Sequence, residues 1–164
     1  MPTGNFGDIL AGYYAKRMGL PVGKLVCASN ENNVLTDFLT TGTYTAKREF
    51  FKTTSPSMDI LVSSNLERLL YHVTGSDAEV AGLMKSLAET GSYTVRPETL
   101  AAIQENFSCG WSSEEEVAGR SVSATRRTIT CVIPTPPLRS MWQRRKSARA
   151  CPWWCCPPRL PSSS

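Results

Sequence analysis

The chain has 164 residues, of which 41% are hydrophobic and 20% are charged, and its formal net charge is +4. This length allows one domain with a sizeable core. Six cysteines without a secretory signal favour a reducing compartment over a disulfide framework, and no apolar run approaches the ~20 residues that cross a bilayer. The composition therefore excludes a disulfide scaffold and a membrane span, and it predicts a soluble, cytoplasmic protein.

Residues 2–8, Pro-Thr-Gly-Asn-Phe-Gly-Asp, form a turn that leads directly into a helical pattern. Gly4 and Gly7 allow backbone N–H groups to approach an anion closely. The first helical turn, from Asp8 onwards, adds unpaired donors and the positive end of the helix dipole. This arrangement is typical of a phosphate-binding loop. A glycine-rich turn without a ligand is the alternative that these residues alone leave open.

The pattern after this turn predicts alternating helices and strands. A helix is expected over residues 8–18, with Gly19 ending it and with these side chains available for burial: Ile9, Leu10, Tyr13, Tyr14 and Met18. Residues 22–28 predict a buried strand in which Cys27 is a buried thiol.

A polar turn follows this strand. Asn30 to Asn33 are expected to cap a short helix that runs through Phe38. A strand, a phosphate loop, a helix and a second strand make a βαβ unit, for which a right-handed crossover and a parallel sheet are the rule. The fold class is therefore α/β, and a ligand is expected at the carboxyl ends of the strands, where Gly4 to Gly7 would lie.

The segment 55–70 carries the next polar features. Residues 55–59 predict a loop, and a helix is expected to begin at Ser64 or Asn65, either of which is a plausible N-cap. Arg68 has two interpretations that stay open. Its guanidinium suits bidentate binding of a phosphate, and it equally suits an ion pair with a nearby carboxylate, Glu67 or Asp59.

Two more helices are expected before residue 119. Residues 76–89 carry apolar side chains at helical spacing and predict an amphipathic helix packed on a core. Residues 97–105 predict a shorter helix with Pro97 in its first turn.

The composition changes sharply near residue 119. Residues 1–119 hold fourteen acidic and nine basic residues, whereas residues 120–164 hold nine basic residues and no acidic one. The second part also has seven of the eleven prolines and four of the six cysteines, with neither helical nor strand periodicity. We therefore expect two regions: an α/β region over 1–119, and an irregular or disordered tail over 120–164.

Two functions suggested by this tail are disfavoured. Its arginines and tryptophans could be taken for a nucleic-acid patch, but incidental charge is the simpler explanation. The run from Cys151 to Cys156 could be taken for a metal or redox site, but the single histidine, His72, lies far upstream and there is no second CxxC pair. We expect no metal, no nucleic acid and no membrane among the ligands and partners.

Two long stretches of residues 1–117 are distinctive: PTGNFGDILAGYYAKRMGLPVGKLVCASNENNVLTDFLTTGTY and SPSMDILVSSNLERLL. Together they resemble threonine synthase. The resemblance implies a pyridoxal-phosphate enzyme of the tryptophan-synthase-β fold type. Residues 1–119 would then be a partial cofactor-binding catalytic domain with a parallel sheet of fold type II. It also implies a piece of a longer two-domain chain, in which the strand that enters the loop is missing.

The resemblance assigns roles to particular residues. Gly4, Asn5, Phe6 and Gly7 match the loop that binds the cofactor phosphate, with Thr3 as a flanking contributor. The Schiff-base lysine is expected upstream of this chain, so no catalytic residue is assigned. The lysines of residues 1–119 match no such motif and are expected in solvated helices and loops: Lys16, Lys24, Lys47, Lys52 and Lys85.

The resemblance also explains the tail as a frameshift. Because tryptophan has a single codon, Pro152–Pro158 read in a frame displaced by two nucleotides gives (Met, Leu or Val)-Val-Val-Leu followed by small residues. The family's final strand reads much like Met-Val-Val-Leu-Ser-Thr-Ala. In the same frame Val132–Pro137 permits Asp-Pro-His-Thr-Ala, another family motif. Residues 120–164 are therefore expected to be translated out of frame.

The function implied is the conversion of O-phospho-L-homoserine and water to L-threonine and phosphate, through an aldimine of pyridoxal 5'-phosphate. This chain alone is expected to be inactive and poorly stable. Two alternatives remain: a phosphate-ligand binding module without catalysis, and a basic-tailed interaction protein. The sequence leaves the oligomeric state and the individual substrate-binding residues open.

Overall fold

The computed structural model describes residues 1–119. The elements are α1 (Gly7–Arg17), β1 (Leu25–Ser29), α2 (Val34–Thr41), β2 (Thr43–Thr45), the 3-10 turn η1 (Pro56–Met58), α3 (Leu66–Thr74), α4 (Asp77–Thr90), β3 (Ser92–Thr94), α5 (Pro97–Asn106) and β4 (Phe107–Trp111). Residues 114–119 are also helical. The predictions for residues 120–164, including the irregular tail, the arginine and tryptophan patch and the cysteine cluster, lie outside the described residues.

A parallel sheet lies at the centre of the fold. β1 pairs with β4 in parallel from Leu25↔Phe107 to Ser29↔Trp111. On the other side of β1, Pro2 forms a parallel bridge with Ala28. The Ala28 N–H donates to the Met1 carbonyl, and the Thr3 N–H donates to the Ala28 carbonyl, both at 2.9 Å. Residues 1–3 thus pair like the end of a strand that enters the loop, and the predicted parallel βαβ arrangement is confirmed.

Helix α1 follows the loop, but its end differs from the prediction. The helix ends at Arg17, and Met18 is its C-cap. Met18 is 81% exposed, so the expectation that it is available for burial is wrong, whereas Ile9, Leu10 and Tyr13 are buried. The physical reason is the chain reversal that follows, where Gly19 has a φ of +102° and directs the backbone away from the helix.

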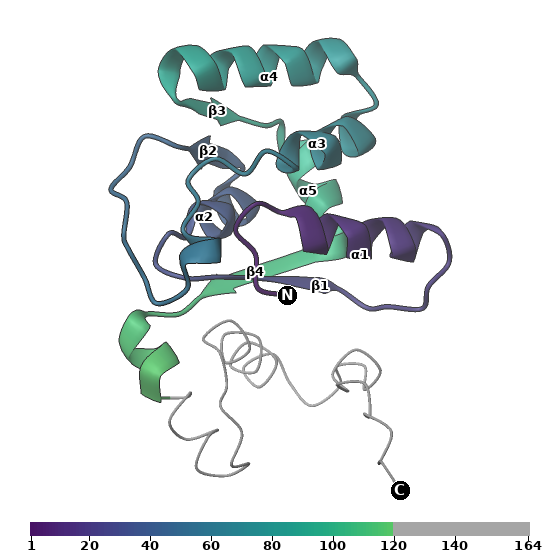
Figure 1. Cartoon of the computed structure of the whole chain (residues 1–164). Coiled ribbons are helices and arrows are strands. Elements are labelled where there is room, and N and C mark those ends of the chain that lie inside the picture. Colours follow the sequence, from purple (N-terminus) through teal and green to yellow (C-terminus); the bar gives the residue numbers. More distant parts are fainter. Residues whose placement is uncertain (120–164) are drawn as a thin grey trace, which may run out of the picture.

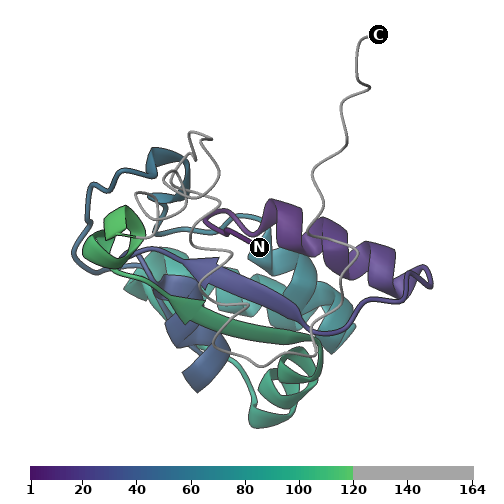
Figure 2. The same cartoon turned by 90° about the horizontal axis from the view of Figure 1, so that it is seen from below.

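The helices pack on one face of the sheet. In Figure 1, α1, α2, α3 and α5 lie on the same side of β1 and β4, and Figure 2, seen from below, shows the two strands side by side. The apolar core between the layers contains Phe6, Ile9, Phe38, Leu69 and Phe107. The core extends up to the loop because Phe6, a loop residue, is one of its fully buried members.

The predicted boundaries of the middle elements need small corrections. The strand expected over 22–28 begins only at Leu25, because residues 20–24 are an exposed connection. The short helix expected to end at Phe38 continues to Thr41, and Asn33 at its N-cap makes no side-chain capping bond. The loop expected over 55–59 contains the 3-10 turn η1.

A second, antiparallel sheet was not predicted. β2 pairs with β3 through Tyr44↔Tyr93, and these two rings are stacked with centroids 5.2 Å apart. α4 lies beside β3 at the edge of the fold (Figure 1). It is capped by Ser76, whose hydroxyl accepts from the Glu79 N–H.

Helix α4 is amphipathic, as predicted, but it packs only partly on the core. Val80, Leu83, Met84 and Leu87 contact the core while remaining partly exposed, and no residue of α4 is fully buried. α4 is also the longest helix of the described part, with 14 residues. No helix within residues 1–119 is long and apolar enough to cross a membrane.

Candidate anion-binding site

The loop singled out in the sequence lies at the carboxyl end of the parallel sheet. Residues 1–3 run parallel to β1, residues 4–6 form a bend, and α1 starts at Gly7. The N-terminal end of α1 is therefore placed directly after a strand-like segment. We refer to Gly4 to Ile9 as the 4–9 segment.

The 4–9 segment presents six successive backbone N–H groups without a protein acceptor. The first helical bond of α1 is donated by the Leu10 N–H to the Phe6 carbonyl, at 3.1 Å. Within residues 1–119, no residue accepts a hydrogen bond from any N–H between Gly4 and Ile9. Unpaired donors at the start of a helix, together with the helix dipole, favour an anion.

The two glycines of the loop have different steric surroundings. A Cβ at Gly4 would lie 3.0 Å from the Met58 Cα and 3.2 Å from the carbonyl oxygens of Ser57 and Met58. A Cβ at Gly7 would meet only the Asn65 Nδ2, at 3.5 Å. Gly4 is therefore required for the close approach of η1 to the loop, whereas the backbone at Gly7 is less constrained.

Phe6 fixes the loop to the core. Its backbone is left-handed, with φ 62°, and its side chain is completely buried. The ring lies 5.5 Å from the ring of Phe107. Left-handed backbone is costly for a bulky side chain, so burial of the ring stabilises a conformation in which the backbone donors stay outside the core.

The start of α3 contacts the loop directly. The Ser64 N–H and hydroxyl both donate to the Asn5 Oδ1, at 2.7 and 2.9 Å. The Asn65 Nδ2 donates to the Asn5 carbonyl at 3.0 Å. Asn65 occupies the N-cap position of α3, which confirms one of the two predicted caps, but its side chain makes no capping bond. The Ser64 and Asn65 side chains are instead hydrogen bonded to the loop.

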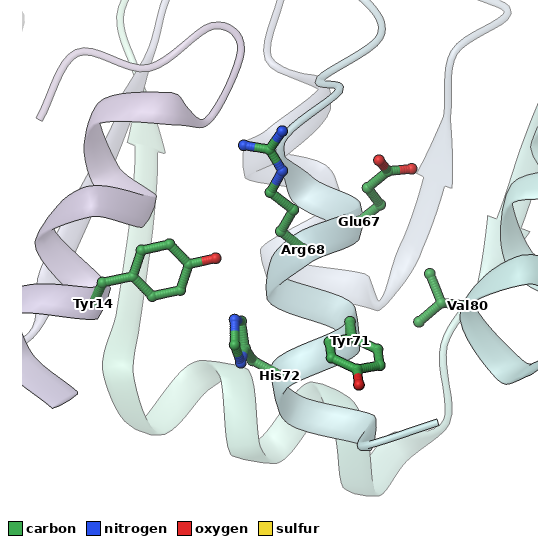
Figure 3. Close-up of a pocket in the computed structure, with 6 residues that line it drawn as sticks. All are labelled: Tyr14, Glu67, Arg68, Tyr71, His72 and Val80. Carbon is green, nitrogen blue, oxygen red and sulfur yellow. The ribbon is translucent and has the colours of Figure 1, made fainter. Parts of the chain in front are cut away.

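Arg68 does not form either of the ion pairs that were considered. Its Nη1 donates to the Asn65 Oδ1 at 3.0 Å, and no carboxylate within residues 1–119 lies in salt-bridge range of it. The Asp59 carboxylate instead accepts from neutral donors. The interpretation of Arg68 as the partner of Glu67 or Asp59 is therefore wrong, and its charge is available on the α1 side of α3 (Figure 3).

A pocket of about 280 Å³ crosses the outer face of α3. Figure 3 shows the side chains that line it, with Arg68 and His72 on the side of α1 and Glu67 and Val80 on the side of α4. The His72 ring lies edge-on to Tyr14, at 5.1 Å. No residue of the 4–9 segment lines this pocket, so it is separate from the anion-binding site.

A second polar group, which sequence reasoning missed, lies after β1. We call Asn30, Asn32, Thr53 and Asp59 the Asp59 cluster. The Asp59 carboxylate accepts four hydrogen bonds: from the Asn30 and Asn32 side-chain amides, and from the Thr53 N–H and hydroxyl. The Asn32 amide also bonds both the N–H and the carbonyl of Phe51. This cluster fixes the 51–59 segment, and with it the η1 turn that packs on Gly4.

Cys27, on β1, and the neighbouring Thr3 are unreactive at neutral pH. Burial raises the pKa of the Cys27 thiol to about 12, with the Thr3 side chain partly opposing this shift. The Thr3 hydroxyl donates to the Met1 carbonyl at 2.8 Å. Cys27 is fully buried, which confirms the predicted strand thiol, and a thiol with so high a pKa is neither a nucleophile nor a metal ligand at neutral pH.

The lysines of residues 1–119 lie in helices or loops, as predicted. Lys16 and Lys24 donate to backbone carbonyls at Gly23 and Gln104, and Lys85 lies 3.9 Å from Glu89. No lysine within residues 1–119 forms a hydrogen bond with the 4–9 segment. The backbone donors of the 4–9 segment are therefore available to an anion, and no lysine side chain within residues 1–119 is hydrogen bonded to them.

Comparisons with known proteins agree with this geometry. The chain is 38% identical over 155 residues to threonine synthase-like 1 from Pongo abelii, covering 93% of this chain and 21% of that protein. It is 46% identical over 117 residues to threonine synthase from Eremothecium gossypii, covering 65% of this chain and 23% of that protein. The solved structure of pyridoxal-phosphate-bound threonine synthase from Brucella melitensis matches with a TM-score of 0.83 and 44% identity, over 89% of this chain and 32% of that one. No protein-family model matches the chain.

The parallel sheet, the loop before α1 and these similarities define the class as a pyridoxal-phosphate-dependent lyase family with an α/β fold. Within that class, the chain belongs to the threonine synthase family. It spans about a fifth to a quarter of the length of these curated relatives.

Proposed function

We propose that residues 1–119 form the part of a threonine synthase that holds the phosphate group of pyridoxal 5'-phosphate. The observation that carries this proposal is the run of six backbone N–H groups, Gly4 to Ile9, without an acceptor in the described part of the chain. A dianionic phosphate supplies several acceptor oxygens and gains from the positive end of the α1 dipole. The size and sign of the group therefore fit the residues present.

In this proposal Gly4, Asn5, Phe6 and Gly7 hold the phosphate through their backbone donors. Such donors are held in position before the ligand arrives and lose no side-chain entropy on binding. Phe6 contributes its N–H while its buried ring anchors the loop. When bound, the cofactor supplies an electron sink for carbanion chemistry at the amino-acid substrate.

The whole protein is proposed to convert O-phospho-L-homoserine and water to L-threonine and phosphate. Relatives named threonine synthase, at 39–46% identity, support this reaction. The reaction needs an amine that reaches the cofactor, and none of the lysines in residues 1–119 is hydrogen bonded to the loop. We therefore propose that the 164-residue chain binds the cofactor phosphate but does not turn over substrate by itself.

A second candidate, a phosphate-ligand binding module without catalysis, is favoured by the same observation that no lysine in residues 1–119 is hydrogen bonded to the loop. The two candidates predict different activities for the full-length protein to which this chain belongs. If the larger gene product releases phosphate from O-phosphohomoserine, it is a threonine synthase. If it binds the ligand without turnover, it is a binding module.

Binding is tested with pyridoxine 5'-phosphate, which keeps the phosphate but lacks the aldehyde and so cannot react with surface lysines. Titration calorimetry on the 164-residue chain should show saturable binding of this ligand and no binding of pyridoxine. Equal binding of both ligands, or of neither, would contradict the assignment of the 4–9 segment to the phosphate. A phosphate-release assay on the same 164-residue chain should detect no turnover of O-phosphohomoserine.

We also propose that the catalytic-domain sequence ends near residue 119 and that residues 120–164 are read out of frame. The composition change and the two family motifs recovered in the displaced frame support this division. Sequencing the source DNA across codons 110–125 tests it directly. If the displaced frame of that DNA does not encode the two family motifs, the frameshift is rejected.

A further inference from the structure

We infer that Ser64, Asn65 and Arg68, at the start of α3, are positioning residues that set the geometry of the phosphate loop. This inference rests on the proposed function of that loop. These three residues are distant from the loop in the sequence, and they contact the loop itself rather than the ligand. Ser64 lies 59 residues beyond Asn5 and is hydrogen bonded to it twice.

Ser64 fixes the orientation of the Asn5 side chain. Both of its donors, the backbone N–H and the hydroxyl, reach the Asn5 Oδ1, at 2.7 and 2.9 Å. A flipped Asn5 amide would place its NH₂ group against these two donors, so the orientation is determined. Within residues 1–119, no residue accepts from the Asn5 Nδ2. Asn5 thereby adds a side-chain donor to the six backbone donors of the 4–9 segment.

Asn65 fixes the loop backbone in the same way. Its Nδ2 donates to the Asn5 carbonyl at 3.0 Å, and its Oδ1 accepts from the Arg68 Nη1 at 3.0 Å. Because a guanidinium can only donate, Arg68 fixes which end of the Asn65 amide faces the loop. The Asn5 peptide is held from its carbonyl side, and this orientation leaves the next N–H, that of Phe6, free for a ligand.

Arg68 also contributes charge. It has no carboxylate partner in the part of the chain that the structure describes, and it is connected to the loop through Asn65. An uncompensated positive charge close to the N-terminal end of α1 favours a dianion over a monoanion or a neutral ligand. The ligand class is therefore a dianionic phosphate monoester, and loss of this charge should reduce affinity for the phosphate group selectively.

The test is the affinity of the 164-residue chain for pyridoxine 5'-phosphate, measured by calorimetry at fixed ionic strength. Asn65→Asp is nearly isosteric, but it replaces the donor to the Asn5 carbonyl with a negative oxygen. We expect affinity to fall by about tenfold or more. Ser64→Ala, which keeps the backbone donor, should cost about threefold, and Ser64→Thr should restore affinity.

Arg68 is tested by a matched pair. Arg68→Met should weaken binding about fivefold, whereas Arg68→Lys, which keeps the charge and a donor, should stay within about twofold of the unmodified chain. Glu67→Gln is the control on the same helix, because Glu67 faces the α4 side of the pocket (Figure 3). The ³¹P chemical shift of the bound ligand should move with Asn65→Asp and stay constant with Glu67→Gln.

These outcomes distinguish a failure of the positioning role from a failure of the proposed phosphate-binding function. If the unmodified chain binds pyridoxine 5'-phosphate and the Ser64→Ala, Asn65→Asp and Arg68→Met variants bind it within twofold, the positioning role is overturned while the phosphate loop stands. If the unmodified chain does not bind it, the proposed function fails and this inference fails with it. Thermal melting identifies any variant that does not fold, and the Ser64 pair then decides the result.

Discussion

The 4–9 segment and the Asp59 cluster are both polar, and both lie at the carboxyl end of the parallel sheet, but their hydrogen bonding is opposite. In the Asp59 cluster the carboxylate accepts four bonds, and the amides of Asn30 and Asn32 are also engaged. In the 4–9 segment, six backbone donors have no acceptor within residues 1–119.

This difference separates a structural polar group from a binding group. A buried donor or acceptor without a partner costs stability, so a group whose role is structural is satisfied by the protein itself. A group that binds a ligand leaves its donors free for that ligand. The Asp59 cluster should therefore govern folding, and the 4–9 segment should govern affinity.

The largest expected effect is on the stability contributed by the Asp59 cluster. Asp59→Ala removes the acceptor of four donors, and it should lower the free energy of unfolding by about 3 kcal/mol. Urea denaturation measures the change, with Glu105→Ala as the control because Glu105 is exposed and makes no described contact. A loss equal to that of the control would mean that the cluster does not stabilise the fold.

Ligand binding at the 4–9 segment should stabilise the folded chain. At a concentration a hundred times the dissociation constant, pyridoxine 5'-phosphate should raise the free energy of unfolding by about 2.7 kcal/mol. Differential scanning calorimetry with and without the ligand gives this value, and pyridoxine serves as the control. A melting temperature that does not change at saturation would remove the distinction between the two regions.

Gly4 joins the two regions, because it packs on the η1 turn that the Asp59 cluster holds. Gly4→Ala would place a methyl group 3.0 Å from the Met58 Cα, and it should cost about 2 kcal/mol of stability through overpacking against backbone. The matched control is Gly23→Ala, since a Cβ at Gly23 meets nothing within 4 Å. Equal melting temperatures for the two variants would show that η1 moves away without cost.

The smallest expected effect is at Gly7. A Cβ there makes an ordinary contact of 3.5 Å with the Asn65 Nδ2, and its φ is not left-handed. Gly7→Ala should therefore change the free energy of unfolding by less than about 0.5 kcal/mol. Gly82→Ala, within α4 and in open space, should gain about 1 kcal/mol by helix propensity. A large loss at Gly7 would contradict the contrast with Gly4.

The local pattern of apolar and turn-forming residues in the sequence was sufficient to predict most of the fold around the site. The predictions of α1, α4, α5 and the parallel sheet are confirmed, apart from boundary shifts of one to three residues. The β2–β3 sheet was not predicted, because strands of three residues carry too short a period to be recognised. The sequence did not decide whether Arg68 binds a phosphate or forms an ion pair with Glu67 or Asp59. In the structure its hydrogen-bond partner is Asn65, which was not predicted.

The sequence by itself was sufficient to single out the candidate anion-binding turn, because a glycine-rich turn before a helix leaves backbone donors unpaired through local geometry alone. Only the tertiary structure decided what holds that turn in place. The contacts of Asn5 with Ser64 and of Asn30 with Asp59 join residues 59 and 29 positions apart. Such pairs depend on how the chain folds back on itself, and no local periodicity encodes them.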